Sequence, residues 1–334
     1  MHIFKDTTFD FLRWRWHAVA LSGVMLLAGS VMIVTRGLPL GIEFAGGTAI
    51  IAQFEDQPSI EAVRTALTEA FPGGGQNIVV QGYGDPSLRQ VLVRVPEVGD
   101  ESGASLSTIA DETSEALRQG NLGEFTVIGT EIVGPAVGQE LATKGIYAFA
   151  ASLMGILAYI AFRFQLSFAV GAVVATIHDI LITVAFLSFF QYDLTLNVVA
   201  AILTVTGYST NDTIVIFDRV RENLRSRRRE PLRDVVNRSI NQTLGRTVIT
   251  MGTTLFSAVA LFMFGGEVLR GFAFTMIVGV ITGTYSSVFV AAAVVTLWRG
   301  RNTTARATAQ SARVASPRPA LPKRAKSNRR ASAS

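Results

Sequence analysis

Six runs of mostly apolar residues occupy much of this chain of 334 residues. The hydrocarbon layer of a bilayer is ~30 Å thick, so a helix needs about 20 such residues to cross it. Only 16% of the residues are charged, against about 25% in soluble domains. We therefore predict a polytopic α-helical membrane protein with six transmembrane helices. They are expected at residues 17–35, 145–162, 166–190, 194–217, 247–264 and 268–298.

The first run also has features of a cleaved signal peptide, because Lys5, Arg13 and Arg15 precede it. It lacks a convincing A-x-A cleavage site, however, which a signal peptide would have. We therefore interpret it as a retained transmembrane span.

Basic residues are concentrated in two of the segments outside these runs. Residues 218–246 contain nine Arg, and residues 299–334 contain ten basic residues and no acidic ones. Residues 36–140 contain five Arg against fifteen Asp and Glu. Because Lys and Arg favour the cytoplasmic side of a membrane, we expect an Arg-rich loop at 218–246 and both termini, 1–16 and 299–334, to be cytoplasmic. Residues 36–140 then form an extracytoplasmic, periplasmic domain of a multi-pass protein in the cell inner membrane.

The net charge of +5 follows from this topology, so we expect no nucleic-acid partner. The basic tail at 299–334 has no apolar periodicity and is rich in Ala, Ser, Arg and Pro. A segment of that composition cannot bury enough apolar surface to fold, so the tail is predicted to be disordered. Its charge would also suit anionic lipid or ribosomal RNA.

Residues 36–140 alternate between strand-like and helix-like patterns. The order strand-helix-strand-strand-helix-strand is typical of the ferredoxin-like α+β arrangement. That fold hosts many functions, so it does not identify one. Strands are predicted at 46–55, 76–84, 89–96 and 124–134, and helices at 59–71 and 105–120.

Motifs for catalysis and metal binding are missing from the sequence. It has no Cys, which excludes disulfides, Cys-based metal sites and a Cys nucleophile. Its three His, at positions 2, 17 and 178, are too scattered for a metal cluster. A Walker loop, a GxSxG elbow and an HExxH helix are also missing. We therefore expect no enzyme activity, no cofactor and no metal site.

Two of the runs carry polar residues at helical spacing. Asp212 lies five residues before Phe217, which places it ~8 Å inside the cytoplasmic end of its helix at 1.5 Å per residue. Because the two helices run antiparallel, Arg246 lies near the same depth and a contact with Asp212 is geometrically feasible. The first stripe comprises Asn197, Thr204, Tyr208, Asn211 and Asp212, and the second Arg246, Thr250, Thr253, Thr254 and Ser257.

Asp212 and Arg246 each have a structural and a functional interpretation. Asp212 could end its span at the interface, although the apolar TIVIF after it keeps the carboxylate below the headgroups. Arg246 could be a positive-inside anchor. The functional interpretation is a proton path, because low dielectric favours a neutral carboxyl group and a nearby Arg favours the charged form. An Arg that moves toward and away from the carboxylate would couple its protonation to conformation.

A second carboxylate, Asp179, lies near the middle of the run at 166–190. A lone charge there costs roughly 2.5–3.5 kcal/mol on insertion scales, so it must be paired, protonated or turned into the bundle. Asp179 is either a structural carboxylate, satisfied by Asn197, a Thr or His178, or a member of the proton path. His178 itself is most simply a satisfied core residue.

Small residues recur at every fourth position of the run at 268–298. Side chains of this size let two helices approach closely. We interpret the series as a helix-packing seam without chemistry of its own, and the spacing does not identify the partner helix. Its members are Gly271, Thr275, Gly279, Gly283 and Ser287.

Several of these segments resemble the SecD/SecF family. GIEFAGGT after the first run resembles the family signature G-x-D-F-x-G-G, here Gly41, Glu43, Phe44, Gly46 and Gly47. The segments HDILIT, GYSTNDTIVIFDRVREN, LGRTVIT and FGGEVLRGFAFTMIVGVITGTYSS resemble the SecF branch, and the match covers roughly residues 35–298. Glu43 departs from the usual Asp, which keeps the carboxylate and changes its reach.

Gly46 and Gly47 of this signature have two interpretations. They could allow a bulge where the first strand leaves the membrane. Alternatively, they form a hinge that transmits helix movement to the outside domain, which is the interpretation we favour.

The resemblance implies a fold, a function and partners. Members are similar to RND-type transporters, in which a SecD half and a SecF half of six spans each form a pseudo-symmetric pair. The pair assists the SecYEG channel in exporting preproteins, and YajC and YidC are further partners of the family. An Asp at the position of Asp212 and an Arg at that of Arg246 belong to its proton pathway and face a membrane Asp supplied by SecD. Asp179 is a third candidate; the supporting polar residues are Asn211, Asn197, His178 and Thr250.

Three functional hypotheses stay open from the sequence. The leading one is an export subunit that, with SecD, uses the proton motive force to assist SecYEG and breaks no covalent bond. The alternative is a self-contained RND-like exporter of a lipid or small hydrophobic molecule, working as a homo-oligomer. The third is a sensor, although no signalling module is recognisable. An adjacent reading frame for a six-span SecD partner would favour the first.

Overall fold

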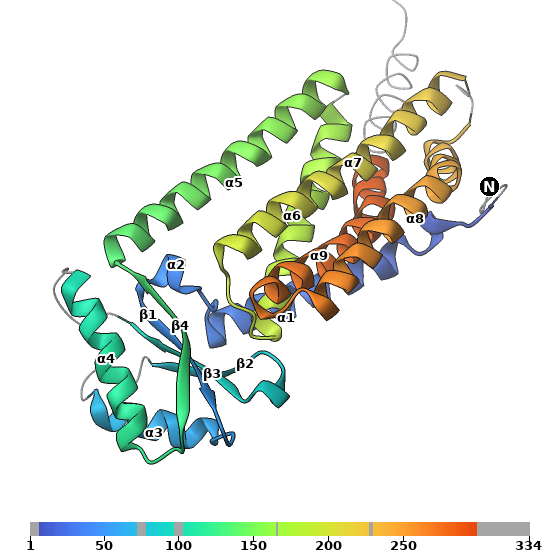
Figure 1. Cartoon of the computed structure of the whole chain (residues 1–334). Coiled ribbons are helices and arrows are strands. Elements are labelled where there is room, and N and C mark those ends of the chain that lie inside the picture. Colours follow the sequence, from blue (N-terminus) through green and yellow to red (C-terminus); the bar gives the residue numbers. More distant parts are fainter. Residues whose placement is uncertain (1–6, 72–77, 97–102, 165, 227–229, 299–334) are drawn as a thin grey trace, which may run out of the picture.

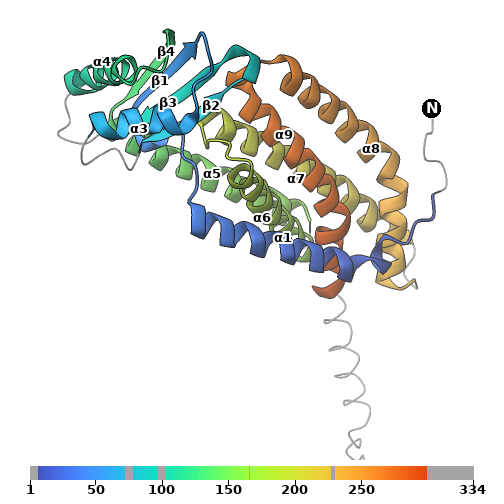
Figure 2. The ribbon, with the colours of Figure 1, turned by 90° about the horizontal axis from the view of Figure 1, so that it is seen from below.

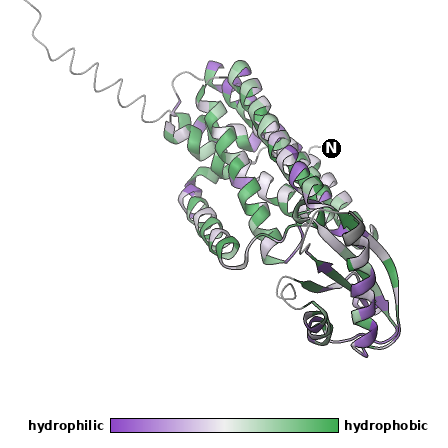
Figure 3. Ribbon diagram, turned by 90° about the vertical axis from the view of Figure 1, so that its left-hand side faces the viewer, coloured by the Kyte–Doolittle hydropathy of each residue, from purple (hydrophilic) through white to green (hydrophobic). Residues whose placement is uncertain are grey.

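A computed structural model of the chain describes residues 7–71, 78–96, 103–164, 166–226 and 230–298. These residues form a bundle of long helices with a small α/β domain at one end (Figure 1). Hydrophobic residues dominate the bundle, whereas hydrophilic residues are frequent in the small domain (Figure 3). The predicted tail, residues 1–6 and residues 227–229 of the predicted Arg-rich loop lie outside the described residues.

Six long helices form the bundle in the described part of the chain. The last of them, α9, is followed by a π-helical turn, η4 (Ser287–Ala291), and the chain then stays helical to Trp298. The helices are α1 (Arg15–Arg36), α5 (Pro135–Arg163), α6 (Leu166–Phe189), α7 (Leu196–Ser226), α8 (Leu232–Phe264) and α9 (Glu267–Ser286).

Five helical stretches of the described residues are long and apolar enough to cross a membrane. They are Arg15–Thr35, Pro135–Arg163, Leu166–Phe189, Leu232–Phe264 and Glu267–Trp298. The run at 194–217, predicted as the fourth span, lies in α7 from Leu196 onward and is not among them. Polar residues such as Asn211 and Asp212 lower the hydropathy of that helix. α7 nevertheless lies within the bundle, where α6, α8 and α9 pack against it.

The segment at 218–246, predicted as an Arg-rich loop, is mostly helical in the described residues, which corrects that prediction. α7 continues to Ser226, and α8 already begins at Leu232. The extensions are amphipathic, so they can pack against each other beyond the apolar runs. The buried Asn223 of α7 donates a hydrogen bond of 2.8 Å to the buried Ser239 of α8.

The helices differ in how much of their surface the bundle covers. In the most apolar window of each helix, 56% of the residues are buried in α6 and 67% in α9, against 6% in α5 and 17% in α8. The peripheral helices expose large side chains, such as Phe162 of α5 at 95% and Phe264 of α8 at 83%. Continuous apolar surface of this kind is typical of contact with lipid or with another membrane protein.

The small domain contains one antiparallel sheet with the strand order β2-β3-β1-β4. The helices α3 and α4 lie together on the face of the sheet that is turned away from the bundle (Figure 2). Buried apolar residues such as Phe54, Leu67, Val93 and Leu117 form the core between them and the sheet. The elements are β1 (Gly47–Phe54), α3 (Ile60–Ala70), β2 (Val79–Tyr83), η3 (Pro86–Leu88), β3 (Gln90–Val95), α4 (Gly103–Gln119) and β4 (Phe125–Val133).

The domain is fastened to the loop between α6 and α7. Arg94 of β3 forms an ion pair of 2.6 Å with Asp193 in that loop, and both side chains are largely buried. Gln81 of β2 donates a further hydrogen bond of 3.1 Å to Asp193. The backbone N–H of Leu194 donates to the carbonyl of Pro39 at 2.7 Å. The loop that leads into α7 therefore contacts both the sheet and the segment that enters the domain.

Candidate functional site

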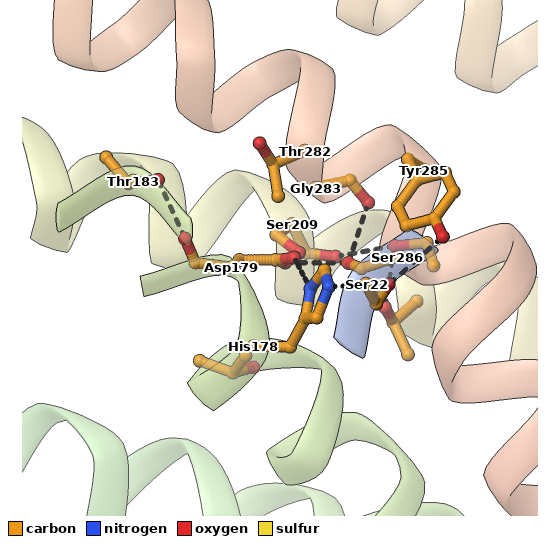
Figure 4. Close-up of polar contacts among 12 residues, drawn as sticks. Ser22, His178, Asp179, Thr183, Ser209, Thr282, Gly283, Tyr285 and Ser286 are labelled. Atoms are coloured by element: carbon orange, nitrogen blue, oxygen red, sulfur yellow. Dashed lines mark hydrogen bonds and ion pairs between the residues drawn. The ribbon is translucent and has the colours of Figure 1, made fainter. Parts of the chain in front are cut away.

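Asp179 of α6 is buried, with 2% of its surface exposed, and both of its oxygens are hydrogen-bonded. Its Oδ1 lies 3.0 Å from His178 Nδ1. Its Oδ2 accepts hydrogen bonds from the hydroxyls of Ser209 of α7 at 2.6 Å and Ser286 of α9 at 2.7 Å. The side chains converge on the carboxylate from three different helices (Figure 4). Asp179 is thus paired as the sequence required, and His178 is one of its partners.

The hydrogen bonds continue from His178 to α1 and α9. His178 Nε2 lies 2.9 Å from Ser22 Oγ of α1, which lies 3.0 Å from the Tyr285 hydroxyl of α9. Tyr285 donates its one hydroxyl proton to the backbone carbonyl of Ala18 at 2.6 Å. Ser22 must therefore donate to Tyr285, and His178 must donate to Ser22 through Nε2.

This order of donors determines how many protons the contact between His178 and Asp179 needs. Since Nε2 already carries a proton, the contact between Nδ1 and Oδ1 needs one more proton, on either atom. The pair is then either an imidazolium with a carboxylate or a neutral imidazole with a carboxylic acid. Chemically, it is a buried acid–base pair joined by one hydrogen bond.

Asp212 of α7 is equally buried, with 4% of its surface exposed, but it is only half satisfied. Its Oδ1 accepts a hydrogen bond of 2.5 Å from the Thr247 hydroxyl of α8. Its Oδ2 is buried and has no hydrogen-bond partner among the described residues. A buried polar atom without a partner costs about 1–3 kcal/mol, so a position of this kind is uncommon without a reason.

The structure does not bring Arg246 into contact with Asp212. Successive residues on a helix point about 100° apart, so α8 turns Thr247 toward α7 and leaves Arg246 exposed. Arg246 instead lines a cavity of about 260 Å³ with Arg163, Asp218 and other residues of α5 and α7. The contact that the sequence made feasible is thus replaced by a hydrogen bond from the neighbouring threonine.

Most of the polar stripes point away from the two carboxylates. The exposed residues are Asn197, Thr204, Tyr208 and Asn211 on α7 and Arg246, Thr250, Thr253 and Ser257 on α8. Asn197 does not contact Asp179 as the sequence suggested; it lies at the start of α7 and lines a cleft of about 430 Å³ beside the small domain. The Thr250 hydroxyl donates to the backbone carbonyls of Arg246 and Thr247.

The tyrosine Tyr83 lines the same cleft. Burial, and secondarily the charges of Glu267 and Glu131, raise the pKa of its hydroxyl above the ordinary value. Tyr83 therefore stays neutral at physiological pH and adds no charge to the cleft.

The small residues of α9 pack against α7. A Cβ atom added to Gly279 would lie 2.4 Å from the Val205 side chain, and one added to Gly283 would lie 2.9 Å from Ser209. Gly271 faces Val198 in the same way, at 3.2 Å. This close approach carries Ser286 of α9 to Asp179.

The glycine signature lies where the chain passes from α1 into the domain. The residues of α2 (Ile42–Ala45) follow Gly41, where a Cβ would lie 2.4 Å from the Glu43 carboxylate. Gly46 and Gly47 have φ angles of +72° and +110°, which favour glycine. They join α2 to β1 without a bulge, since the irregularity of β1 lies farther along, between Ile51 and Ala52.

Glu43 and Phe44 connect this signature to two helices of the bundle. Glu43 Oε1 accepts a hydrogen bond of 3.4 Å from the backbone N–H of Leu196, the first residue of α7. A carboxylate is favoured there by the helix dipole. The carbonyl of Phe44 faces Gly138 of α5, where a Cβ would lie 3.3 Å away.

Sequence reasoning missed the hydroxyl groups that complete both sites. Ser22, Ser209, Ser286 and Thr247 are small hydroxyl residues, and each resembles a neutral packing residue in the sequence. One signal was available, because Ser286 directly precedes Ser287, the last member of the series of small residues.

Comparison with known proteins identifies related chains over most of this length. A family model described as protein export membrane protein SecD/SecF, C-terminal, matches residues 113–301, and one for the SecD/SecF GG motif matches residues 31–58. The protein translocase subunit SecF of Desulfurispirillum indicum is 43% identical, with 87% of this chain and 92% of that protein covered. That of Escherichia coli O157:H7 is 40% identical, with 85% and 86% covered.

Solved structures show the same likeness. The crystal structure of SecDF, a translocon-associated membrane protein from Thermus thermophilus, matches with a TM-score of 0.78 and 36% identity. The match covers 90% of this chain and 40% of that one, so the present chain spans less than half of the SecDF chain. One family model covers more than half of the residues, and the relatives are similar over almost their full length. The chain therefore belongs to the SecD/SecF family of protein-export membrane proteins.

Proposed function

We propose that the chain is a SecF-type accessory subunit of Sec protein export, and that it works with a SecD-type partner chain driven by the proton motive force. The names of its relatives support the export role. The observation that carries the proton-coupled part is Asp212, a buried carboxylate with one oxygen that no described residue satisfies.

A partner chain would cover the exposed polar faces of α7 and α8. Polar groups such as Asn211 and Thr250 are exposed at the depth of the bundle, where contact with lipid is unfavourable. The SecDF chain, of which this chain spans 40%, contains further sequence that could supply that cover. A SecD-type half placed there would bring its own polar groups close to Asp212 and Arg246.

The proposed topology has six spans, with α7 as the fourth, in the cell inner membrane. Both termini are then cytoplasmic, in keeping with the positive-inside rule. The small domain lies in the periplasm, and its strand order β2-β3-β1-β4 supports the proposal of a ferredoxin-like arrangement. We expect α7 to be tolerated in the membrane because its polar residues face other helices or the partner.

Proton transfer at Asp212 would move the small domain through α7. In one state Arg246 approaches and stabilises the carboxylate; in the other it retreats, as in the present structure, and the group binds a proton. Each charge that crosses the membrane yields ~2.3 kcal/mol per 100 mV. At the other end of α7, Asp193 in the preceding loop forms an ion pair with Arg94 of the small domain. Glu43 accepts a hydrogen bond from the first turn of α7. Movement of the domain would then act on a preprotein leaving the SecYEG channel, with YajC and YidC as further partners.

The test is export driven by the proton motive force in vesicles that contain the chain with Asp212→Asn. An amide of the same size cannot exchange the proton, so we expect proton-dependent export to fall at least tenfold while the protein stays inserted. The matched control is Asp234→Asn, an exposed carboxylate in the first turn of α8. Normal export by the Asp212 variant would contradict the proposal.

A further inference from the structure

Three arginines gather at the end of the bundle that lies away from the small domain. Arg163, Arg221 and Arg225 line two adjoining cavities of about 380 and 540 Å³. Arg163 is the last residue of α5, and the other two lie one turn apart near the end of α7. We call this site the arginine pocket.

The charge of the arginine pocket is only partly compensated. Asp218 lies 3.8 Å from Arg163, and both are about half exposed. Glu222 also lines the pocket but forms its ion pair with Arg219. Neither Arg221 nor Arg225 forms an ion pair with another described residue. The pocket therefore presents two free guanidinium groups, which suit an anion with several acceptor oxygens.

One side of the pocket is apolar rather than polar. Phe162, Phe164, Phe168 and Leu224 line the smaller cavity beside the arginines. Phe162 is 95% exposed, and α5, which carries it, is the helix least covered by the bundle. A site for a free, fully hydrated anion has no use for such a wall, whereas the first carbons of an acyl chain would pack on it.

The depth of the pocket in the bundle fits the headgroup layer. α5 ends at Arg163 and α6 begins at Leu166, so the chain turns back there at the end of two apolar helices. In the proposed topology this end faces the cytoplasm, where anionic lipids concentrate and basic pockets between transmembrane helices bind headgroups.

We propose that the arginine pocket binds the headgroup of an anionic phospholipid. Arg221 and Arg225 hold the phosphate, Arg163 closes the pocket from α5, and one acyl chain lies along Phe162. This site bridges α5 and α7, so a bound lipid fastens the peripheral helix to the bundle. The inference depends on the membrane placement of these helices and is independent of proton transfer at Asp212.

The experiment measures lipid binding to the full chain, purified in mild detergent with the subunits that accompany it. Native mass spectrometry counts bound dioleoyl phosphatidylglycerol and dioleoyl phosphatidylcholine, with inorganic phosphate as a competitor. For the unmodified chain we expect at least tenfold tighter binding of the anionic lipid than of the zwitterionic one, and no displacement by millimolar phosphate. Equal binding of the two lipids, or displacement by phosphate, would overturn the proposal.

Matched variants locate the site. Arg221→Gln with Arg225→Gln should weaken phosphatidylglycerol binding about tenfold. The control, Arg233→Gln with Arg238→Gln, removes the same amount of charge from α8, outside the arginine pocket. It should leave phosphatidylglycerol binding unchanged. If the first pair does not fold, Arg221→Lys with Arg225→Lys keeps the charge, loses the two-pronged contact, and should weaken binding severalfold. Unchanged binding in whichever pocket variant folds, or an equal loss in the control, would overturn the assignment.

Discussion

The bundle contains two buried carboxylates on neighbouring helices, and the structure completes only one of them. Asp179 has both oxygens satisfied by His178, Ser209 and Ser286. Asp212 has a single partner, Thr247, and one oxygen without any among the described residues. Burial is nearly the same at both positions, so the difference lies in the partners and not in the distance from water.

The difference separates a structural role from a functional one. A fully satisfied polar network rigidifies a core and specifies its arrangement, and Asp179 connects α6 to α7 and α9 in this way. An open carboxylate that lies beside exposed polar faces is incomplete within its own chain. We infer that Asp179 stabilises the packing of the bundle. The free oxygen of Asp212 is instead available to a group of a partner chain or to a proton.

Removing the two carboxylates should have very different effects on stability. Asp179→Ala leaves His178, Ser209 and Ser286 buried without an acceptor, so we expect a loss of about 3–5 kcal/mol in the free energy of unfolding. Asp212→Ala leaves only one buried donor, the Thr247 hydroxyl, without its acceptor, so its loss should be smaller, about 1–3 kcal/mol. Unfolding in detergent by increasing denaturant measures both. Equal losses would break the comparison.

The helix seam should be the next most sensitive feature, because it places Ser286 at Asp179. Gly283→Ala puts a methyl group 2.9 Å from the Ser209 side chain, and overpacking of this kind typically costs about 1–3 kcal/mol. Gly252→Ala is the control, since nothing lies within 4 Å of the added atom. The same unfolding assay measures both variants. If Gly252→Ala were as unstable as Gly283→Ala, the claim that close packing at Gly283 stabilises the bundle would be contradicted.

The smallest effect on stability is expected at Arg246. It is exposed and forms no ion pair with Asp212 in this structure, so Arg246→Lys should change the free energy of unfolding by less than about 0.5 kcal/mol. Export driven by the proton motive force should still fall, because an ammonium cannot reproduce the planar guanidinium fork. Full export in this variant would mean that Arg246 serves only as a charged anchor.

The fold was accessible from the sequence to the extent that it follows from local periodicity. Apolar runs and alternating patterns predict the long helices and the order of strands in the small domain. These patterns did not predict the helices within 218–246, where the charge indicated a loop. An amphipathic helix can continue beyond the membrane when a neighbouring helix covers one of its faces. The patterns also cannot show that α9 packs on α7, since the spacing of Gly279 and Gly283 names no partner.

The sequence predicted the carboxylates of the candidate site but not the Ser and Thr hydroxyl groups that contact them. A carboxylate within an apolar run is costly, so Asp179 and Asp212 stand out at once. Ser22, Ser209 and Thr247 cost little in any environment and give no such signal. The direction of Arg246 depends on the rotation of α8 about its axis, which is set by tertiary packing.

The most direct test of proton binding at Asp212 is infrared difference spectroscopy of the complex between two pH values. A carboxyl group that gains a proton produces a C=O stretching band distinct from that of a carboxylate. The account predicts that this band is lost in Asp212→Asn and is retained in Asp179→Asn. A band that survives in Asp212→Asn, or that disappears only with Asp179, would contradict it.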